Sequence, residues 1–284
     1  MEWRRICVDS RFRTAESASS SDFWIELPYP VQVEKGSLMY LDGICLSNSW
    51  PSIRQGVNDT LYIQEHVVGQ APDNIPVYLQ EGTYTAHTLK TEILTRLNAA
   101  TLLPGTYTLD LDNGKYTFGN TSIAATQGRS LIFSKEHVDN TTFMKTFFGS
   151  GYSGASCTEM IGLFTNPMLA DGSAYIHSTQ SLTGSFVDMV RHKQLFIHAP
   201  GLGETSTMNL SGNADIVRRV LLGGSGQGDV VTDTLSTGLS SISFSTDTTL
   251  QHIHFQIKGY DGLIIPMSNH EVSWEIVIQR PDGK

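Results

Sequence analysis

The last fifth of the sequence carries the pattern that most restricts the fold. Apolar and polar residues alternate in residues 251–258 and again in residues 271–279. Because successive side chains along a strand point to opposite faces, each stretch is predicted to be a strand with one apolar face. Two such strands bury their apolar faces only when a second sheet covers them, which predicts that they close a β-sandwich. The side chains expected in the core of that sandwich are Phe255, Ile257, Trp274 and Ile276.

The segment between these two stretches contains a turn. Tyr260-Asp261-Gly262 ends in a glycine, which adopts positive φ at no steric cost. Three apolar residues follow, and Pro266 either ends that run or confines it to a sheet edge.

Composition agrees with a β-rich fold. The chain has 284 residues, enough for one large domain or two smaller ones with a substantial core. Only 17% of the residues are charged, while Gly, Ser and Thr are abundant, which is typical of an all-β protein with many turns. The formal net charge of −9 argues against nonspecific binding of a phosphate backbone, and we expect no specific nucleic-acid site.

Short alternating runs predict further strands along the chain. Residues 38–46 are nearly continuous in apolar residues apart from Asp42-Gly43, which predicts a central strand covered on both faces with a bulge at the glycine. Residues 214–222 fit a strand or a short helix equally well, because Asp215 can begin a helix. The other expected strands are residues 23–27, 61–67, 75–79, 107–111, 116–118, 131–133, 174–176 and 195–198.

The middle of the chain differs, with one amphipathic helix and one hairpin. Residues 85–100 place apolar side chains on one helical face. Thr85 is a suitable N-cap residue, and Pro104-Gly105 ends the helix. Asn113-Gly114 between two alternating runs is a strong hairpin signal. We therefore expect residues 75–167 to form a small α+β insertion and residues 23–74 and 168–284 to form the sandwich.

Residues 1–22 are interpreted as an N-terminal arm, because a basic and apolar stretch precedes a Ser-rich linker. The arm would order on a neighbouring subunit and place its arginines against carboxylates or nucleic acid. The alternatives are a frayed terminus and an edge strand formed by residues 3–8. The interface residues expected in the arm are Trp3, Arg4, Arg5, Arg11, Phe12 and Arg13.

The sequence contains no specific catalytic or metal-binding pattern. The glycine-rich run at 223–228 lacks the residues of a phosphate-binding loop. His252 and His254 share one strand face, and His270 could complete a zinc site, but a solvated polar face is the favoured interpretation. Asp110 and Asp112 beside Asn113-Gly114 fit ordinary turn chemistry. We expect neither an enzyme nor a bound cofactor or metal.

The cysteines and the N-terminal residues indicate whether the chain would enter the secretory pathway. Cys7, Cys45 and Cys157 match neither a zinc site nor a disulfide framework, and they are expected to be free buried thiols. Residues 1–30 lack the apolar core of a signal peptide, and no apolar run approaches the roughly 20 residues that span a bilayer. The four Asn-x-Ser/Thr sequons, at Asn58, Asn120, Asn140 and Asn209, are therefore expected to be chance matches.

The order of elements resembles one viral protein family. The matching stretches are ICVDSRFRTAESASSSDFWIELP, SLMYLDGICLSNSW, IPVYLQEGTYTAHTLKTEILTRLNAA and LQHIHFQIKGYDGLIIPMSNHEVSWEIVIQ. They are similar to the minor capsid, or penton, proteins of virophages, polinton-like elements and related double-stranded DNA viruses of the adenovirus-like lineage. The family features here are Asp9-Ser10-Arg11, with Arg13 near a family arginine, and the Asp261-Gly262 turn between two strands.

This resemblance implies a single jelly-roll β-sandwich with an inserted domain and no enzymatic activity. Five copies would fill each icosahedral vertex and contact the major capsid protein and other minor capsid proteins. The protein would be made and assembled inside the host cell and would reside in the virion capsid.

Other functions remain open from the residues alone. One is a viral spike or receptor-binding module, another is a carbohydrate-binding or carbohydrate-active β-sandwich, and a third is an α+β hydrolase. A carbohydrate site would place exposed Trp or Tyr side chains beside carboxylates in a groove. Trp50 and Trp274 are instead in apolar, strand-like contexts and are expected in the core.

Overall fold

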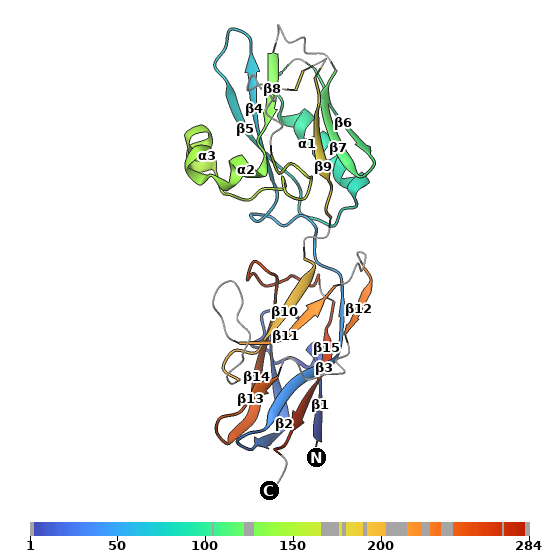
Figure 1. The fold of residues 1–284 in the computed structure, drawn as a ribbon, viewed down its shortest axis with the longest axis vertical. Helices are drawn as coiled ribbons and strands as arrows, with labels where there is room; N and C mark the ends of the chain where they lie inside the picture. The colour runs from blue at the N-terminus through green and yellow to red at the C-terminus, as the bar shows by residue number, and fades with distance from the viewer. Residues whose placement is uncertain are drawn as a thin grey trace. The chain divides into compact units, whose positions relative to one another are not determined.

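The chain forms two compact units, Met1–Trp50 with His192–Lys284, and Pro51–Arg191 (Figure 1). The computed structural model describes residues 3–103, 105–121, 128–165, 176–177, 180–189, 192–202, 215–222, 228–233, 241–268 and 270–281. None of the helices in these ranges is long and apolar enough to cross a membrane.

The first unit contains two antiparallel sheets. One has the strand order β1-β15-β3-β12, with the two-residue β13 also paired to β3, and the other has the order β11-β10-β14-β2. The strands are β1 (Trp3–Asp9), β2 (Asp22–Val33), β3 (Leu38–Ser47), β10 (Gln194–His198), β11 (Ile216–Leu221), β12 (Val230–Asp233), β13 (Ile242–Ser243), β14 (Thr248–Lys258) and β15 (Ser273–Gln279).

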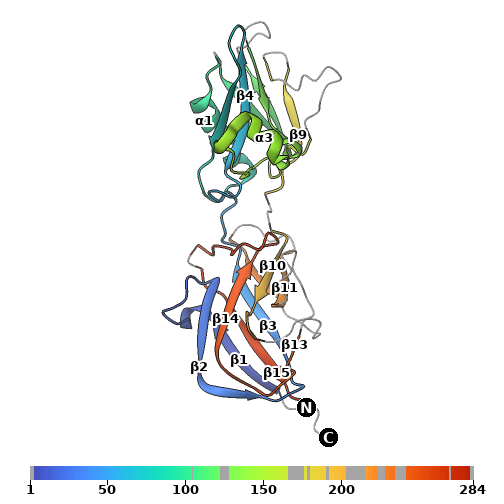
Figure 2. The ribbon, with the colours of Figure 1, turned by 90° about the vertical axis from the view of Figure 1, so that its left-hand side faces the viewer.

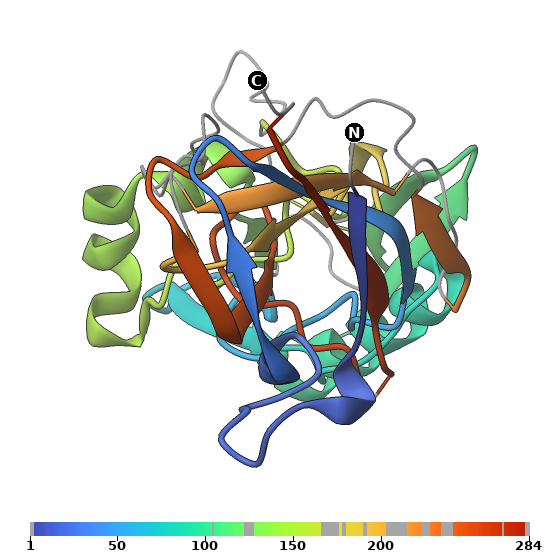
Figure 3. The same cartoon turned by 90° about the horizontal axis from the view of Figure 1, so that it is seen from below.

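The strand pairs of this unit are nested. The first strand, β1, lies beside the last, β15 (Figure 3), and β2 lies beside β14 (Figure 2). Inside these pairs, β3 lies beside β12 and β10 lies beside β11. Two antiparallel sheets connected in this nested order form a jelly roll. The predicted fold class, mainly β with a jelly-roll sandwich, is confirmed.

The jelly-roll core joins side chains from both sheets. Phe23 of β2 and Phe255 of β14 belong to one sheet, and Trp274 of β15 belongs to the other. Their ring centroids lie 5.1–5.8 Å apart in the three pairs. Ile257 and Ile276 are also buried here. All four side chains that the alternation assigned to the core therefore lie in it.

The second unit follows β3 in the chain and precedes β10. It has two three-stranded antiparallel sheets, with the orders β5-β4-β8 and β6-β7-β9, and one long helix. Its elements are β4 (Thr60–Val67), β5 (Asp73–Tyr78), α1 (Ala86–Ala100), β6 (Tyr107–Asp112), β7 (Lys115–Asn120), β8 (Gly128–Ile132), α2 (Lys135–Asp139), α3 (Thr141–Phe148), the 3-10 turn η2 (Gly149–Gly151) and β9 (Leu182–Phe186).

Local chemistry places the main elements of this unit where the sequence predicts them. The Thr85 hydroxyl accepts a hydrogen bond from the Thr88 N–H, and the Thr88 hydroxyl accepts one from the Thr85 N–H, so a capping box begins α1. Leu89, Ile93 and Leu97 line its buried face. Asn113 and Gly114 both adopt positive φ, at 49° and 72°, as the tight turn between β6 and β7 requires.

The division between the units differs from the expected limits of 75 and 167. The chain leaves the jelly roll after Trp50 and returns at His192. The reason is that β4, which we assigned to the sandwich, pairs with β5 and β8 of the second unit instead. An alternating pattern marks a strand but does not reveal which sheet it joins.

Four strands of the jelly roll correct or settle expectations. β3 is central, with the expected irregularity at Asp42-Gly43, but its burial alternates, so only one face is covered. Residues 216–221 are a strand rather than a helix. β14 and β15 belong to opposite sheets, and among the described residues of the turn between them a single bridge forms, from Lys258 to Ile264. The apolar face of each strand is covered by the opposite sheet, as expected, but the two strands do not pair with each other.

Candidate functional site

The N-terminal segment holds the six residues expected at an interface, and most of it belongs to the jelly roll itself. β1 pairs antiparallel with β15 over its whole length, from Trp3 opposite Gln279 to Asp9 opposite Ser273. The interpretation of residues 1–22 as an arm without a strand partner in its own subunit was therefore wrong. The alternative, an edge strand, is the observed structure. Its partner lies about 270 positions away, so no local pattern could reveal the pairing.

The outward face of β1 carries Trp3 and Arg5. Trp3 is 47% exposed and meets Tyr40 of β3 edge to face, with ring centroids 6.3 Å apart. The Arg5 Nη1 donates to Glu275 Oε2 of β15 at 2.6 Å, and this bond raises the pKa of the guanidinium. Arg4 is exposed, and its side chain makes no hydrogen bond or ion pair with any described residue.

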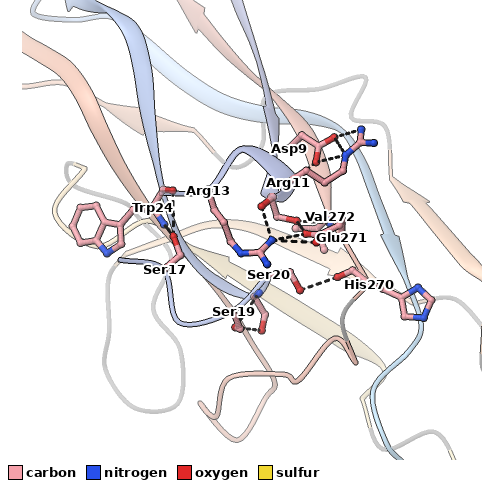
Figure 4. A network of polar contacts seen from close by, with 12 residues as sticks. Asp9, Arg11, Arg13, Ser17, Ser19, Ser20, Trp24, His270, Glu271 and Val272 are labelled. Atoms are coloured by element: carbon pink, nitrogen blue, oxygen red, sulfur yellow. Dashed lines mark hydrogen bonds and ion pairs between the residues drawn. The ribbon is translucent and has the colours of Figure 1, made fainter. Parts of the chain in front are cut away.

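The 3-10 turn η1 (Ser10–Phe12) follows β1 and is braced by ion pairs (Figure 4). Asp9 accepts from the Arg11 N–H and from the Arg11 guanidinium, and this bonding holds the pKa of the carboxyl group below its ordinary value. Arg13 Nη1 donates to the Ser10 carbonyl at 2.8 Å and to both oxygens of Glu271 at 3.0 and 3.1 Å. The Ser10 hydroxyl also donates to Glu271.

Phe12 projects from this braced turn. Its side chain is 77% exposed, the largest value among the exposed large hydrophobic residues of the described chain. A large apolar side chain on a rigid turn is suited to anchor a partner, because little conformational entropy is lost when it docks.

Residues 14–24 connect η1 to the second sheet through hydrogen bonds. The Thr14 N–H donates to the Trp24 carbonyl at 2.9 Å, and the Trp24 N–H donates to the Ser17 hydroxyl at 2.9 Å. The Ser20 hydroxyl donates to the His270 carbonyl at 2.8 Å. Figure 4 shows the Ser17–Trp24 and Ser20–His270 contacts beside the Arg13–Glu271 pair. The Ser-rich stretch that suggested a flexible linker is therefore tied to the jelly roll.

The histidines occupy different environments. His252 is exposed, but His254 is partly buried, so the expectation of a solvated face was wrong for His254. Its Nε2 lies 2.7 Å from Asp22 Oδ1, and its ring stacks on Trp24 with centroids 4.4 Å apart. Within the described ranges no group of three His, Cys, Asp or Glu side chains is placed to hold a metal.

The other candidate residues do not converge. Asp110 is exposed beside Lys90 at 3.6 Å, and Asp112 accepts from the Asn113 amide. The glycine run at 223–228 lies outside the described residues except for Gly228. Among the cysteines only Cys157 is buried, and burial raises the pKa of its thiol to about 12. Cys45 is partly exposed and Cys7 exposed, which corrects the expectation of three buried thiols.

The sequons also differ in exposure. The side chains of Asn58 and Asn120 are buried, and that of Asn58 bonds the Ser52 carbonyl and the Arg54 N–H. Asn140 caps α3 through a hydrogen bond to the Phe143 N–H, and Asn209 lies outside the described residues.

Sequence reasoning missed the acidic partners of the N-terminal arginines. Glu271 and Glu275 lie at polar positions of the alternating stretch 271–279, and the alternation by itself predicts no partner for them. For Glu275 the signal was present, because a carboxylate on one strand attracts a cation on the adjacent strand, whereas Glu271 precedes β15 and meets Arg13 beyond the end of β1. Sequence reasoning also missed the buried Arg218 of β11, whose Nη2 lies 2.8 Å from Asp233 Oδ2 of β12. This pair connects edge strands of the two sheets.

Comparison with known proteins bears on the fold. No protein-family model and no curated protein sequence matches the chain. Among solved structures, the mavirus penton protein superposes with a TM-score of 0.51 and 8% sequence identity. The match covers 98% of this chain and 99% of the penton protein, so it includes both the jelly roll and the inserted unit. Over nearly its whole length, the chain therefore has the fold of a virophage penton protein.

Proposed function

We propose that the protein is a penton-like minor capsid protein, a structural component that forms homopentamers at icosahedral vertices. It contacts the major capsid protein and other minor capsid proteins in the virion. We assign it no enzymatic role and no specific nucleic-acid site.

One observation carries this proposal. The similarity to the mavirus penton protein extends over 98% of the chain, across a jelly roll and a second unit inserted after its third strand. A jelly roll alone hosts many functions. A jelly roll interrupted by a second α+β unit, matched from end to end, is a far more restrictive architecture.

The charge and the buried side chains are consistent with this proposal. The formal charge of −9 disfavours general binding to packaged nucleic acid. Trp50 and Trp274 are buried in the core, so neither can serve as the exposed platform of a carbohydrate site. Trp24 is 36% exposed, but its ring stacks on His254, which occupies one of its faces.

The proposal is tested by the mass of the purified protein and by its place in the particle. Native mass spectrometry is expected to detect an assembly of five times the chain mass of 31.2 kDa. Electron cryomicroscopy of particles from the source virus is expected to place the chain around the five-fold axes. Density for this chain at positions other than the vertices would contradict the proposal.

A further inference from the structure

The strand β1 is a sheet edge with backbone groups that lack partners in the described chain. The Ser10 N–H donates to the carbonyl of Val272, the residue opposite it in the register, so this pair is hydrogen-bonded. Hydrogen-bonded pairs alternate along an antiparallel ladder. The N–H and C=O groups of Val8, Ile6 and Arg4 therefore point toward β15, and those of Cys7, Arg5 and Trp3 point away from the sheet.

Two other edges of the jelly roll, β2 and β12, are protected against further pairing. β2 carries Pro28 and Pro30, and its register with β14 shifts between Leu250 and His252. β12 has only four residues. Prolines, bulges and short length are the usual devices that blunt an edge strand. β1 has seven residues, no proline and an uninterrupted register with β15.

Two side chains beside this edge also lack full burial or an ionic partner within the described chain. Val8 is buried, but Ile6, which packs against the core from the same face, is only partly buried. Arg4 is exposed and lacks an ionic partner among the described residues. An added strand that brought an apolar side chain next to Ile6 and a carboxylate next to Arg4 would cover the first and neutralise the second.

We infer that β1 accepts a further antiparallel or parallel strand from another capsid protein. The added strand is an extended segment with apolar residues at alternate positions and an acidic residue beside Arg4. This inference rests on the proposed function, because it assumes that the protein donating the strand is a neighbour in the capsid. A second copy that offered its own β1 would pair about a two-fold axis and form a dimer, which does not fit a five-fold ring.

The test replaces Cys7 by proline and by serine. Cys7→Pro removes one N–H that points away from β15 and leaves the ladder with β15 intact, whereas Cys7→Ser retains that N–H. Both variants are expected to fold and to melt like the wild type. When each is co-expressed with the capsid proteins of the source virus, Cys7→Ser is expected to enter particles normally, and Cys7→Pro at least tenfold less. Equal incorporation of the two folded variants would overturn the inference.

Hydrogen exchange gives a second readout that does not depend on a variant. The amides of Arg5 and Cys7 are expected to exchange rapidly in the isolated protein and at least a hundredfold more slowly in particles. Rapid exchange in particles that contain the wild-type chain at their vertices would overturn the inference and leave the proposed function standing. Slow exchange of these two amides in an isolated protein that forms a dimer would also overturn the inference, because β1 would then pair with a second copy. A wild-type chain that is absent from particles would instead refute the proposed function.

Discussion

Glu271 accepts two hydrogen bonds from Arg13, at 3.0 and 3.1 Å, although 258 positions separate the two residues in the chain. The same carboxylate accepts from the hydroxyl of Ser10, which is fully buried. One acidic side chain ahead of β15 thus orients the turn that follows β1 and presents Phe12 to solvent. The turn that carries the exposed Phe12 is thus held by a residue 258 positions further along the chain than Arg13.

Replacing Glu271 by alanine is expected to lower the free energy of unfolding by about 1–2 kcal/mol, because Arg13 and Ser10 lose their shared acceptor. Glu275→Ala is the matched control. It removes an ion pair to Arg5, whose side chain is 60% exposed, so the loss should be smaller. Urea denaturation measures both values. Equal losses would mean that the Glu271 contacts contribute no more than a surface ion pair.

Trp274→Ala is expected to cost about 3–5 kcal/mol, through lost burial and the cavity that remains between the two sheets. Trp274→Phe should cost less, because it keeps a ring against Phe23 and Phe255 and removes an indole N–H that has no described partner. Trp3→Ala, at a 47% exposed position, should change the melting temperature least. Thermal unfolding followed by circular dichroism distinguishes the three variants, and an unchanged melting temperature in Trp274→Ala would contradict the core assignment.

Deletion of residues 1–9 is expected to yield an insoluble or strongly destabilised protein. The deletion removes β1, exposes the edge of β15 and uncovers the core beside Val8. A matched variant, Phe12→Ala, leaves the strand in place and should fold like the wild type. A soluble deletion variant with an unchanged melting temperature would show that β1 contributes little to the fold.

Stability is expected to fall in alkaline solution because two buried tyrosines resist ionisation. Burial raises the pKa of both Tyr107 and Tyr116 above the ordinary value of 10.0, and the carboxylate of Glu65, 2.7 Å from the Tyr107 hydroxyl, raises the pKa of Tyr107 further. A group whose pKa is raised by folding stabilises the native state below its unfolded pKa and loses this contribution as pH rises above it. Unfolding should therefore become easier from about pH 10 upward.

The variant Tyr116→Phe tests this prediction, since its buried side chain has no proton to lose. It should show a shallower decline in stability between pH 9 and about 11 than the wild type does. Tyr29→Phe, at an exposed position, is the control and should follow the wild-type curve. Denaturation midpoints at several pH values give the slopes, and parallel slopes for all three proteins would contradict the assignment.

Local sequence patterns determined the secondary structure and the buried faces of several elements. The alternation in residues 251–258 and 271–279 correctly assigned Phe255, Ile257, Trp274 and Ile276 to the core. Thr85 and Asn113-Gly114 correctly marked the start of α1 and the turn between β6 and β7. These features are decided within a few residues, because the periodicity of side-chain directions and the φ angles of a turn are local properties of the backbone.

Only the tertiary structure decided which strands pair and where the units divide. Residues 3–9 have the same composition whether they form an arm or a strand, and the ladder with β15 selects the strand. β4 joined the second unit because β5 and β8 complete its sheet, and residues 216–221 became a strand because β10 supplies their ladder. The ion pairs from Arg5 and Arg13 to Glu275 and Glu271 arise only after that pairing. Backbone hydrogen bonds between strands use groups that nearly all residue types share, so they do not select a partner strand. The pairing of distant strands follows from the burial of the whole core, which no short stretch of sequence specifies.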